Sequence, residues 1–159
     1  MNNQKENVII GLGNTIRGDD GIGIYITGFL SKKFKDLVDV VSTEEMGLSL
    51  LDFLSPYKKA VIIDSIYTGK QDTGNIYVFN GKNINDSELK SNHYIGIPEL
   101  IHVARKLRLP FPKEILIIGI SVEDPFTIRP TISEDLKNKI PEILNKIEKI
   151  IKKFFKIEI

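Results

Sequence analysis

The feature that most constrains the fold is a strand, a glycine-rich loop and a helix that follow one another near the start of the chain. Residues 8–10 are a continuous apolar run that ends in glycine, which is typical of a strand buried in a parallel sheet. Residues 11–21 read GLGNTIRGDDG, and we name them the acidic glycine loop. From Gly21 to about Phe34 the apolar residues recur at helical spacing.

The same alternation of strands and helices continues along the chain. Strands are predicted at 38–42, 60–63, 75–79 and 115–120, helices at 47–54, 98–107 and from Ser133 onward, and polar loops at 81–92 and 123–130. Pro141 should kink or restart the last helix. This order predicts an α/β sandwich with a mainly parallel sheet. Because no repeat or linker is visible, we expect residues 1–159 to form a single domain.

The composition limits the classes of function. The 159 residues carry a net charge of +1, which gives no overall field to attract nucleic acid. The chain has no cysteine, which excludes disulfides, thiolate metal sites and cysteine nucleophiles. No apolar run approaches the roughly 18 residues of a membrane span, and residues 1–7 do not resemble a secretory signal. We therefore expect a cytoplasmic protein with neither membrane nor nucleic-acid partners.

The acidic glycine loop has the glycine spacing of a phosphate-binding loop but the opposite charge. Gly13 and Gly18 are separated by four residues, as in a P-loop, yet Asp19 and Asp20 occupy the positions of its lysine and hydroxyl residue. A carboxylate about 5 Å from a phosphate charge would repel it by roughly 3 kcal/mol at an effective dielectric constant of about 20. The loop is therefore predicted to bind a cation, and the late third glycine also departs from the dinucleotide-binding pattern.

A simpler interpretation is that one of these aspartates caps the first helix. Free amides and the helix dipole favour a carboxylate there by up to about 1 kcal/mol. Capping accounts for one aspartate but not for two within a cluster of glycines. We expect Asp19 to cap or support the loop and Asp20 to face the cleft.

Two other segments supply candidate metal ligands. Asp64 ends the strand predicted at 60–63, and ligands of open α/β sheets bind beyond the carboxyl ends of the strands. Asp64 alone also suits a turn or cap. His93 follows a polar loop, whereas His102 is nine residues later and on the opposite side of the helix. Asp20, Asp64 and His93 together form a plausible metal site with open positions.

Four segments match one known family in order. They are residues 8–14 with 19–23, Met46-Gly47 with Leu50-Leu51, residues 62–65, and residues 91–93. On these segments the chain resembles the hydrogenase maturation proteases. These endopeptidases trim the carboxyl-terminal extension from the large subunit of nickel–iron hydrogenases. The joint occurrence is far more specific than any one motif.

The resemblance implies a fold and a metal site. The fold is a three-layer α/β/α sandwich around a five-stranded, mostly parallel mixed sheet, of the phosphorylase/hydrolase-like kind. Asp20, Asp64 and His93 correspond to the family's ligands for nickel, which the substrate carries, so no organic cofactor is expected. The first ligand is glutamate in some members, and aspartate is shorter by one methylene. The implied partner is the hydrogenase large-subunit precursor, and we expect a monomer.

Two mechanisms fit such a site. Nickel held by substrate and protease polarises the scissile carbonyl or activates water, or nickel only docks the substrate while Asp19 or Asp20 acts as general base. The substrate or oxyanion contacts are predicted at Gly13, Asn14 and Gly47, although Gly47 also suits a turn at a helix start. The residues do not decide between these mechanisms.

Two other classes of function compete with the protease. One is an α/β module that binds a nucleotide or small ligand, which Asp19 and Asp20 oppose unless magnesium bridges the charges. The other is a hydrolase such as a peptidyl-tRNA hydrolase, whose opening motif matches only as far as Asn14. Neither a Gly-x-Ser-x-Gly elbow nor a His-Glu-x-x-His motif is present.

Overall fold

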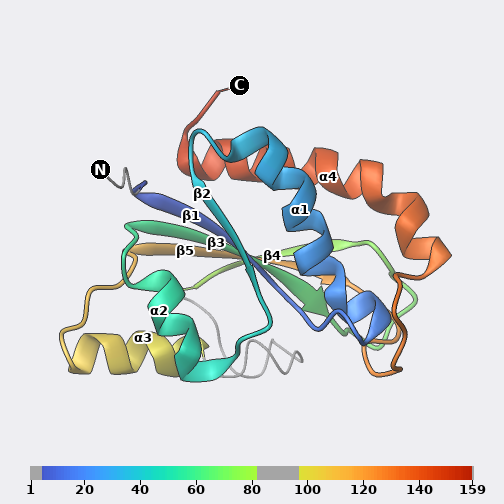
Figure 1. Ribbon diagram of the computed structural model, residues 1–159, viewed down its shortest axis with the longest axis horizontal. Coiled ribbons are helices and arrows are strands. Elements are labelled where there is room, and N and C mark those ends of the chain that lie inside the picture. Colours follow the sequence, from blue (N-terminus) through green and yellow to red (C-terminus); the bar gives the residue numbers. More distant parts are fainter. Residues whose placement is uncertain (1–4, 82–96, 159) are drawn as a thin grey trace.

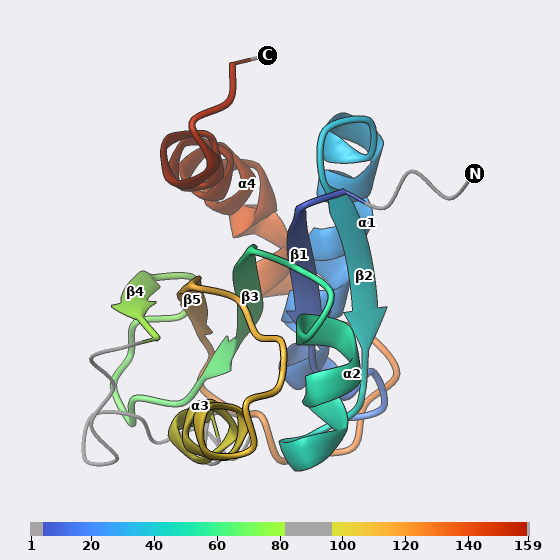
Figure 2. The same ribbon diagram turned by 90° about the vertical axis from the view of Figure 1, so that its left-hand side faces the viewer.

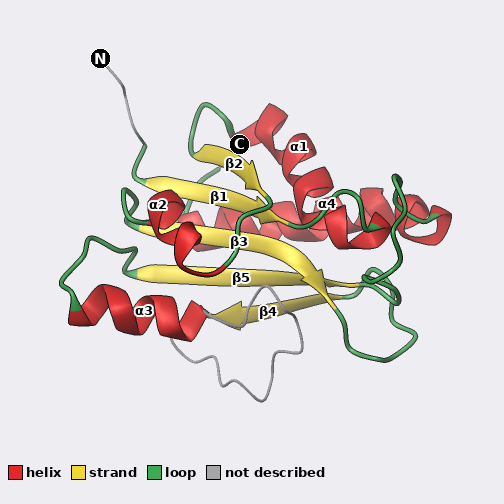
Figure 3. Ribbon diagram, turned by 60° about the horizontal axis from the view of Figure 1, so that its bottom comes forward, coloured by secondary structure: helices red, strands yellow, loops and turns green. Residues whose placement is uncertain are grey.

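The described part of the chain contains one mixed sheet of five strands. The computed structural model describes residues 5–81 and 97–158 of the 159. The strands are β1 (Asn7–Leu12), β2 (Asp39–Thr43), β3 (Lys59–Ile66), β4 (Ile76–Asn80) and β5 (Glu114–Ser121). Their spatial order is β2-β1-β3-β5-β4, and only the edge strand β4 runs antiparallel to its neighbour (Figure 3). The predicted mostly parallel sheet is confirmed.

Helices cover both faces of this sheet. One face carries α1 (Ile22–Phe34) and α4 (Glu134–Phe155), and the other carries α2 (Leu51–Leu54) and α3 (Ile97–Lys106) (Figures 1 and 2). Short 3-10 helices, η1 (Gly18–Gly21) and η2 (Gly47–Leu50), precede α1 and α2. The three-layer architecture is confirmed, and none of the helices in the described ranges combines the length and apolar character that a membrane span requires.

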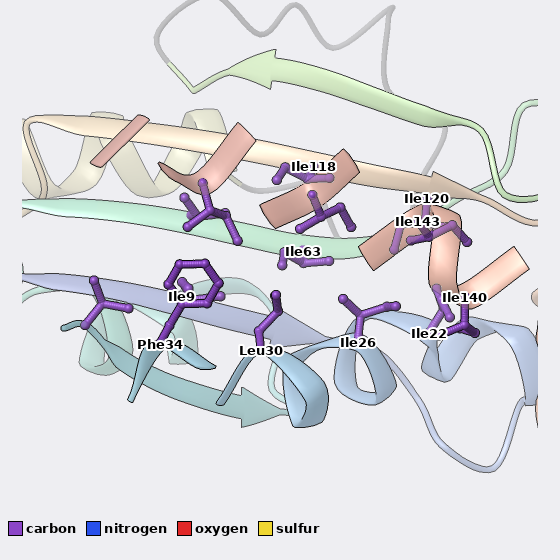
Figure 4. Packing of buried hydrophobic residues seen from close by; sticks show 14 of the residues in the cluster. Ile9, Ile22, Ile26, Leu30, Phe34, Ile63, Ile118, Ile120, Ile140 and Ile143 are labelled. Carbon is purple, nitrogen blue, oxygen red and sulfur yellow. The ribbon is translucent and has the colours of Figure 1, made fainter. Parts of the chain in front are cut away.

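The core explains why the strands read as continuous apolar runs. Alternate residues of a strand point to opposite faces, and here both faces are covered. Ile9 and Ile63 belong to the cluster beneath α1 and α4 (Figure 4). Their neighbours Ile10 and Ile62 belong to the cluster on the α2 and α3 face. Each covered strand therefore needs large apolar side chains at successive positions.

The last helix differs from its prediction in one respect. α4 is a single helix that runs through Pro141, so the predicted restart is wrong. Its buried side chains are Leu136, Ile140, Ile143, Ile147, Ile151 and Phe155. Packing of this stripe against the sheet outweighs the one backbone hydrogen bond that proline removes. Phe155 is the last buried residue of the stripe.

The third strand is longer than predicted, and this places Asp64 inside it. The other predicted elements agree with the structure to within two residues, but β3 continues to Ile66. β1 pairs with β3 only as far as Ile63, whereas β5 pairs with it up to Ile66. Asp64 therefore lies just beyond the point where β1 separates from β3.

This separation coincides with a reversal in the order of the strands. From β1 the chain crosses to β2 on one side and then returns to β3 on the other. Ligands of open α/β sheets bind at such a reversal, beyond the carboxyl ends of the strands. The acidic glycine loop follows β1 at this edge.

Candidate active site

The acidic glycine loop begins with a turn that Asn14 shapes. The backbone N–H of Arg17 donates to the Asn14 carbonyl at 3.1 Å, and the N–H of Ile16 donates to the Asn14 side-chain Oδ1 at 3.2 Å. Side-chain acceptors of this kind replace backbone bonds in tight turns. The turn leads directly into η1, which carries Asp19 and Asp20.

Ser65 brings together the two carboxylates that were predicted as ligands. Its hydroxyl donates to Oδ1 of Asp20 at 2.7 Å, and its backbone N–H donates to Oδ1 of Asp64 at 2.7 Å. Asp64 is fully buried and Asp20 is only 6% exposed. Two segments far apart in sequence thus each hydrogen-bond to the same serine through an aspartate. Asp20 and Asp64 are therefore linked through Ser65, and their sharing of a ligand crevice stays a prediction.

Close backbone packing beneath the loop requires glycine at the start of α1. A Cβ added to Gly23 would lie 2.2 Å from the carbonyl oxygen of Leu12 and 2.4 Å from that of Ile63. The hydroxyl of Thr27 donates to the Gly23 carbonyl in the same region. The first turn of α1 therefore rests directly on the ends of β1 and β3, which fixes the direction in which the acidic glycine loop leaves the sheet.

Asp19 anchors a different part of the molecule. Its Oδ1 accepts from the backbone N–H of Ser133 at 2.7 Å, and its Oδ2 accepts from the Ser133 hydroxyl at 2.8 Å. Ser133 is also the N-cap residue of α4. Neither η1 nor α1 has a side-chain cap, so the interpretation of an aspartate capping the first helix is wrong. Asp19 does support the loop, as expected, but through the start of α4.

A further carboxylate, which no sequence pattern indicated, holds the loop from the β2 side. Oε1 of Glu44 accepts from the Thr15 backbone N–H at 3.0 Å and from the Thr15 hydroxyl at 2.9 Å. These bonds, the backbone one first, hold the pKa of the Glu44 carboxyl below its usual range. Glu44 follows β2, so it links the carboxyl ends of β1 and β2.

The remaining predicted residues occupy distinct places. A Cβ on Gly13 would lie 2.4 Å from the Asp20 carbonyl oxygen, so close packing requires glycine there. Gly47 has a φ of +62° and no atom within 4 Å of an added Cβ, so its backbone conformation alone favours glycine. His102 is exposed on α3. His93 and most of the polar loop predicted at 81–92 lie outside the described residues.

The described residues do not form a complete metal site by themselves. Residues 5–81 and 97–158 contain no group of three or more histidine and acidic side chains that would hold a metal ion by themselves. They do supply the carboxylates of Asp20 and Asp64 at one buried point. Carboxylates and imidazole are ligands for divalent first-row metals. The two carboxylates match this ligand chemistry. The third predicted ligand, His93, lies outside the described residues.

A hollow of about 240 Å³ borders the other side of the loop. Gly18 and Gly21 line it together with Tyr25, Ile132 and Lys137. None of the three aspartates discussed above is among the residues that line it. The hollow therefore lies behind the loop and does not mark the position of the carboxylates.

Comparison with known proteins decides the family. Residues 24–150 match the family model described as hydrogenase maturation protease. The chain belongs to this family. Membership makes it a hydrogenase maturation endopeptidase and rules out the alternative of a simple binding module. The matched range begins after the acidic glycine loop, so it carries no information on Asp19 or Asp20.

Individual relatives agree over most of their length. The hydrogenase 2 maturation protease of Escherichia coli (strain K12) is 22% identical, over 86% of this chain and 87% of the relative. The hydrogenase maturating endopeptidase structure from E. coli superposes with a TM-score of 0.72 at 19% identity and covers 93% of each chain. A [NiFe] hydrogenase maturation protease from Thermococcus kodakarensis gives a TM-score of 0.66 at 24% identity, over 91% of this chain and 98% of that one. The fold is therefore that of known members of the family.

Proposed function

We propose that this endopeptidase removes the carboxyl-terminal extension from the nickel-loaded large-subunit precursor of a [NiFe] hydrogenase. It recognises the nickel that the precursor carries through Asp20, Asp64 and His93. The observation that supports this proposal is the convergence of Asp20 and Asp64 on Ser65, with both acceptor bonds at 2.7 Å. Family membership indicates the class of reaction. The convergence of Asp20 and Asp64 supports the position proposed for the nickel.

The chemistry of the donors supports nickel as the ion. Two carboxylates and one imidazole are a borderline-hard ligand set that leaves coordination positions open. Those open positions are needed if ligands from the precursor remain bound to the nickel. The strand-order reversal between β1 and β3 is also where α/β sheets bind ligands.

The reaction breaks the peptide C–N bond, while water adds hydroxide to the carbonyl carbon and a proton to the leaving amine. In one route nickel polarises the carbonyl or lowers the pKa of the water. In the other route nickel only docks the precursor, and a carboxylate removes the proton from water. The candidates for that base remain Asp19, whose two oxygens accept hydrogen bonds from Ser133, and Asp20, which accepts one from Ser65.

The developing oxyanion needs hydrogen-bond donors close to the scissile carbonyl. We retain Gly13, Asn14 and Gly47 as candidates for these substrate contacts. Gly13 and Asn14 belong to the acidic glycine loop, and Gly47 follows β2 at the same edge of the sheet. Asn14 and Gly47 are half-buried, whereas Gly13 is buried.

Cleavage of a purified precursor tests the function. The protein is mixed with a large-subunit precursor loaded with nickel, and with the same precursor lacking nickel. We expect only the loaded precursor to lose its extension, seen as a gel shift and as a released peptide by mass spectrometry. An intact loaded precursor after prolonged incubation would disprove the proposed activity.

Single substitutions test the ligands. Asp64→Asn and His93→Ala should each reduce cleavage of the loaded precursor by about 10- to 100-fold. His102→Ala is the matched control, because this exposed histidine lies on α3 and should cleave at the wild-type rate. Normal cleavage by His93→Ala would remove that histidine from the site and leave the carboxylates to be tested alone.

A further inference from the structure

Three exposed apolar side chains and one half-buried tyrosine lie on loops at the carboxyl edge of the sheet. Ile16 is 60% exposed, Phe126 57% and Ile128 76%. The ring of Tyr67 contacts that of Phe126 edge to face, with 5.3 Å between the ring centres. We name these four residues the apolar rim. They come from the loops that follow β1, β3 and β5, which all lie at the carboxyl edge of the sheet.

The loop that carries Phe126 and Ile128 is held by hydrogen bonds and an ion pair to Asp124. Asp124 accepts hydrogen bonds from the backbone N–H groups of Phe126 and Thr127, both at 3.0 Å, and from the Thr127 hydroxyl at 2.5 Å. Arg129 adds an ion pair with the same carboxylate at 3.0 Å. Pro125 is buried beside the exposed Phe126. The loop therefore holds its apolar side chains outward by specific bonds.

Two backbone bonds join this loop to the acidic glycine loop. The N–H of Arg129 donates to the Ile16 carbonyl at 2.9 Å, and the N–H of Gly18 donates to the Arg129 carbonyl at 2.8 Å. Ile16 and Ile128 thus belong to paired segments. The anchoring of Asp19 on Ser133 reinforces the same junction. A partner held on the rim is therefore held against the acidic glycine loop.

Both ends of the rim are continuous with the proposed site. Ile16 precedes Asp20 by four residues, and Tyr67 follows Asp64 by three residues. Four residues of chain span at most about 14 Å. A polypeptide whose scissile bond lies at the proposed site can therefore contact the rim within a few residues of that bond.

Leu107 is an exposed apolar residue that lies outside the rim. Leu107 is 63% exposed, but it lies in the connection leading to the start of β5, at the opposite edge of the sheet. Single exposed apolar side chains are ordinary on protein surfaces, whereas groups of them mark interaction sites. The rim is such a group, and Leu107 serves as its control.

We propose that the apolar rim docks the precursor by contacting apolar side chains that flank the scissile bond. This inference rests on the proposed function and names the surface that selects and orients the substrate. Binding energy at the rim places the extension across the carboxylates without taking part in the chemistry. Loss of the rim therefore raises KM and leaves kcat almost unchanged.

The experiment compares Ile128→Asp and Phe126→Asp with Leu107→Asp, using the nickel-loaded precursor. Each rim variant should raise KM about tenfold, with kcat within about twofold of wild type. Leu107→Asp should leave both constants unchanged, and Ile128→Leu should restore the wild-type KM. Thermal unfolding of each variant confirms that it is folded. An unchanged KM in both rim variants would overturn the proposal.

Two further measurements separate this proposal from its alternatives. Direct titration of the wild type and the rim variants with loaded precursor reports docking even if no cleavage occurs, so failure of the proposed function is distinguishable from failure of the rim. Sedimentation of the protein alone tests whether a second copy covers the rim. A wild-type dimer that Ile128→Asp converts to monomer would replace precursor docking with self-association.

Discussion

Ser65 and Asp20 are joined by a hydrogen bond of 2.7 Å across 45 positions of sequence. The same serine holds Asp64 through its backbone N–H. Ser65 is only 3% exposed, so its hydroxyl acts in a site from which water is largely excluded. Ser65 is therefore a positioning residue, which fixes the orientation of the Asp20 carboxylate relative to Asp64.

Replacing this serine should damage the site more than the fold. Ser65→Ala removes one donor from a buried carboxylate, so we expect a loss of about 1–3 kcal/mol in the free energy of unfolding. We also expect kcat for the loaded precursor to fall about tenfold, because Asp20 loses its orientation. Ser65→Thr retains the hydroxyl and should recover part of the rate.

The control for this change is Ser42→Ala, which alters an exposed serine on β2. Its unfolding free energy should stay within about 0.5 kcal/mol of the wild-type value, measured by urea titration. If Ser65→Ala cleaves at the wild-type rate, the hydroxyl does not position Asp20, whatever its effect on stability.

Two glycines of the same helix should respond in opposite directions to alanine. Gly23→Ala places a Cβ 2.2 Å from the Leu12 carbonyl oxygen, and the clash with backbone costs about 1–3 kcal/mol or more. Gly28→Ala meets no atom within 4 Å and should stabilise the protein by about 0.5–1 kcal/mol. Urea unfolding of both variants measures the contrast. Equal effects would mean that α1 does not rest on β1 and β3 as closely as the structure indicates.

The sequence predicted the elements because burial dictates their pattern. Runs such as residues 8–10 and 60–63 are apolar at every position, since helices cover both faces of the sheet. The end of β3 was harder to predict. Asp64 interrupts the apolar run, yet β5 continues to pair with the strand as far as Ile66.

The sequence predicted the kind of site, a cation site, but not the hydrogen bonds that hold its aspartates. The charge of Asp19 and Asp20 alone indicated a cation site. Their partners Ser65, in β3, and Ser133, at the start of α4, could not be paired with them from the sequence, because a single serine does not indicate which side chain it contacts. These contacts depend on which loops meet in space, and only the fold determines that.

The bonds between Asp19 and Ser133 should stabilise the start of α4. Ser133→Ala removes both the helix cap and one donor to Asp19, and we expect it to cost about 1–2 kcal/mol. The variant Asp19→Asn and the double variant Asp19→Asn/Ser133→Ala complete a double-mutant cycle. The coupling free energy of this cycle measures the hydrogen bond between the two side chains. Thr131→Ala, at an exposed neighbour, is the control and should change stability little. Additive effects in the cycle would show that the two side chains do not interact.

The bonds from Thr15 to Glu44 should make the acidic glycine loop sensitive to acid. The pKa of the Glu44 carboxyl is lowered from its usual 4.5, first by the Thr15 backbone bond and then by the Thr15 hydroxyl bond. A lowered pKa means that the folded state favours the charged carboxylate. The contribution of Glu44 to the stability of the folded state is therefore present above pH 4.5. It is lost as the pH falls through the lower pKa that Glu44 has in the folded protein.

The Thr15 amide signal in NMR spectra reports this loss directly. Lowering the pH should move that signal with a midpoint below 4.5, at which the carboxylate takes up its proton and the accepting oxygen loses its charge. Glu44→Gln keeps an oxygen acceptor but cannot titrate, so the movement should disappear while the fold is retained. Glu45→Gln, at the adjacent exposed position, should leave the titration of Thr15 unchanged. A Thr15 signal that moves equally in the Glu44→Gln variant would assign the titration to another group and remove Glu44 as the support of the loop.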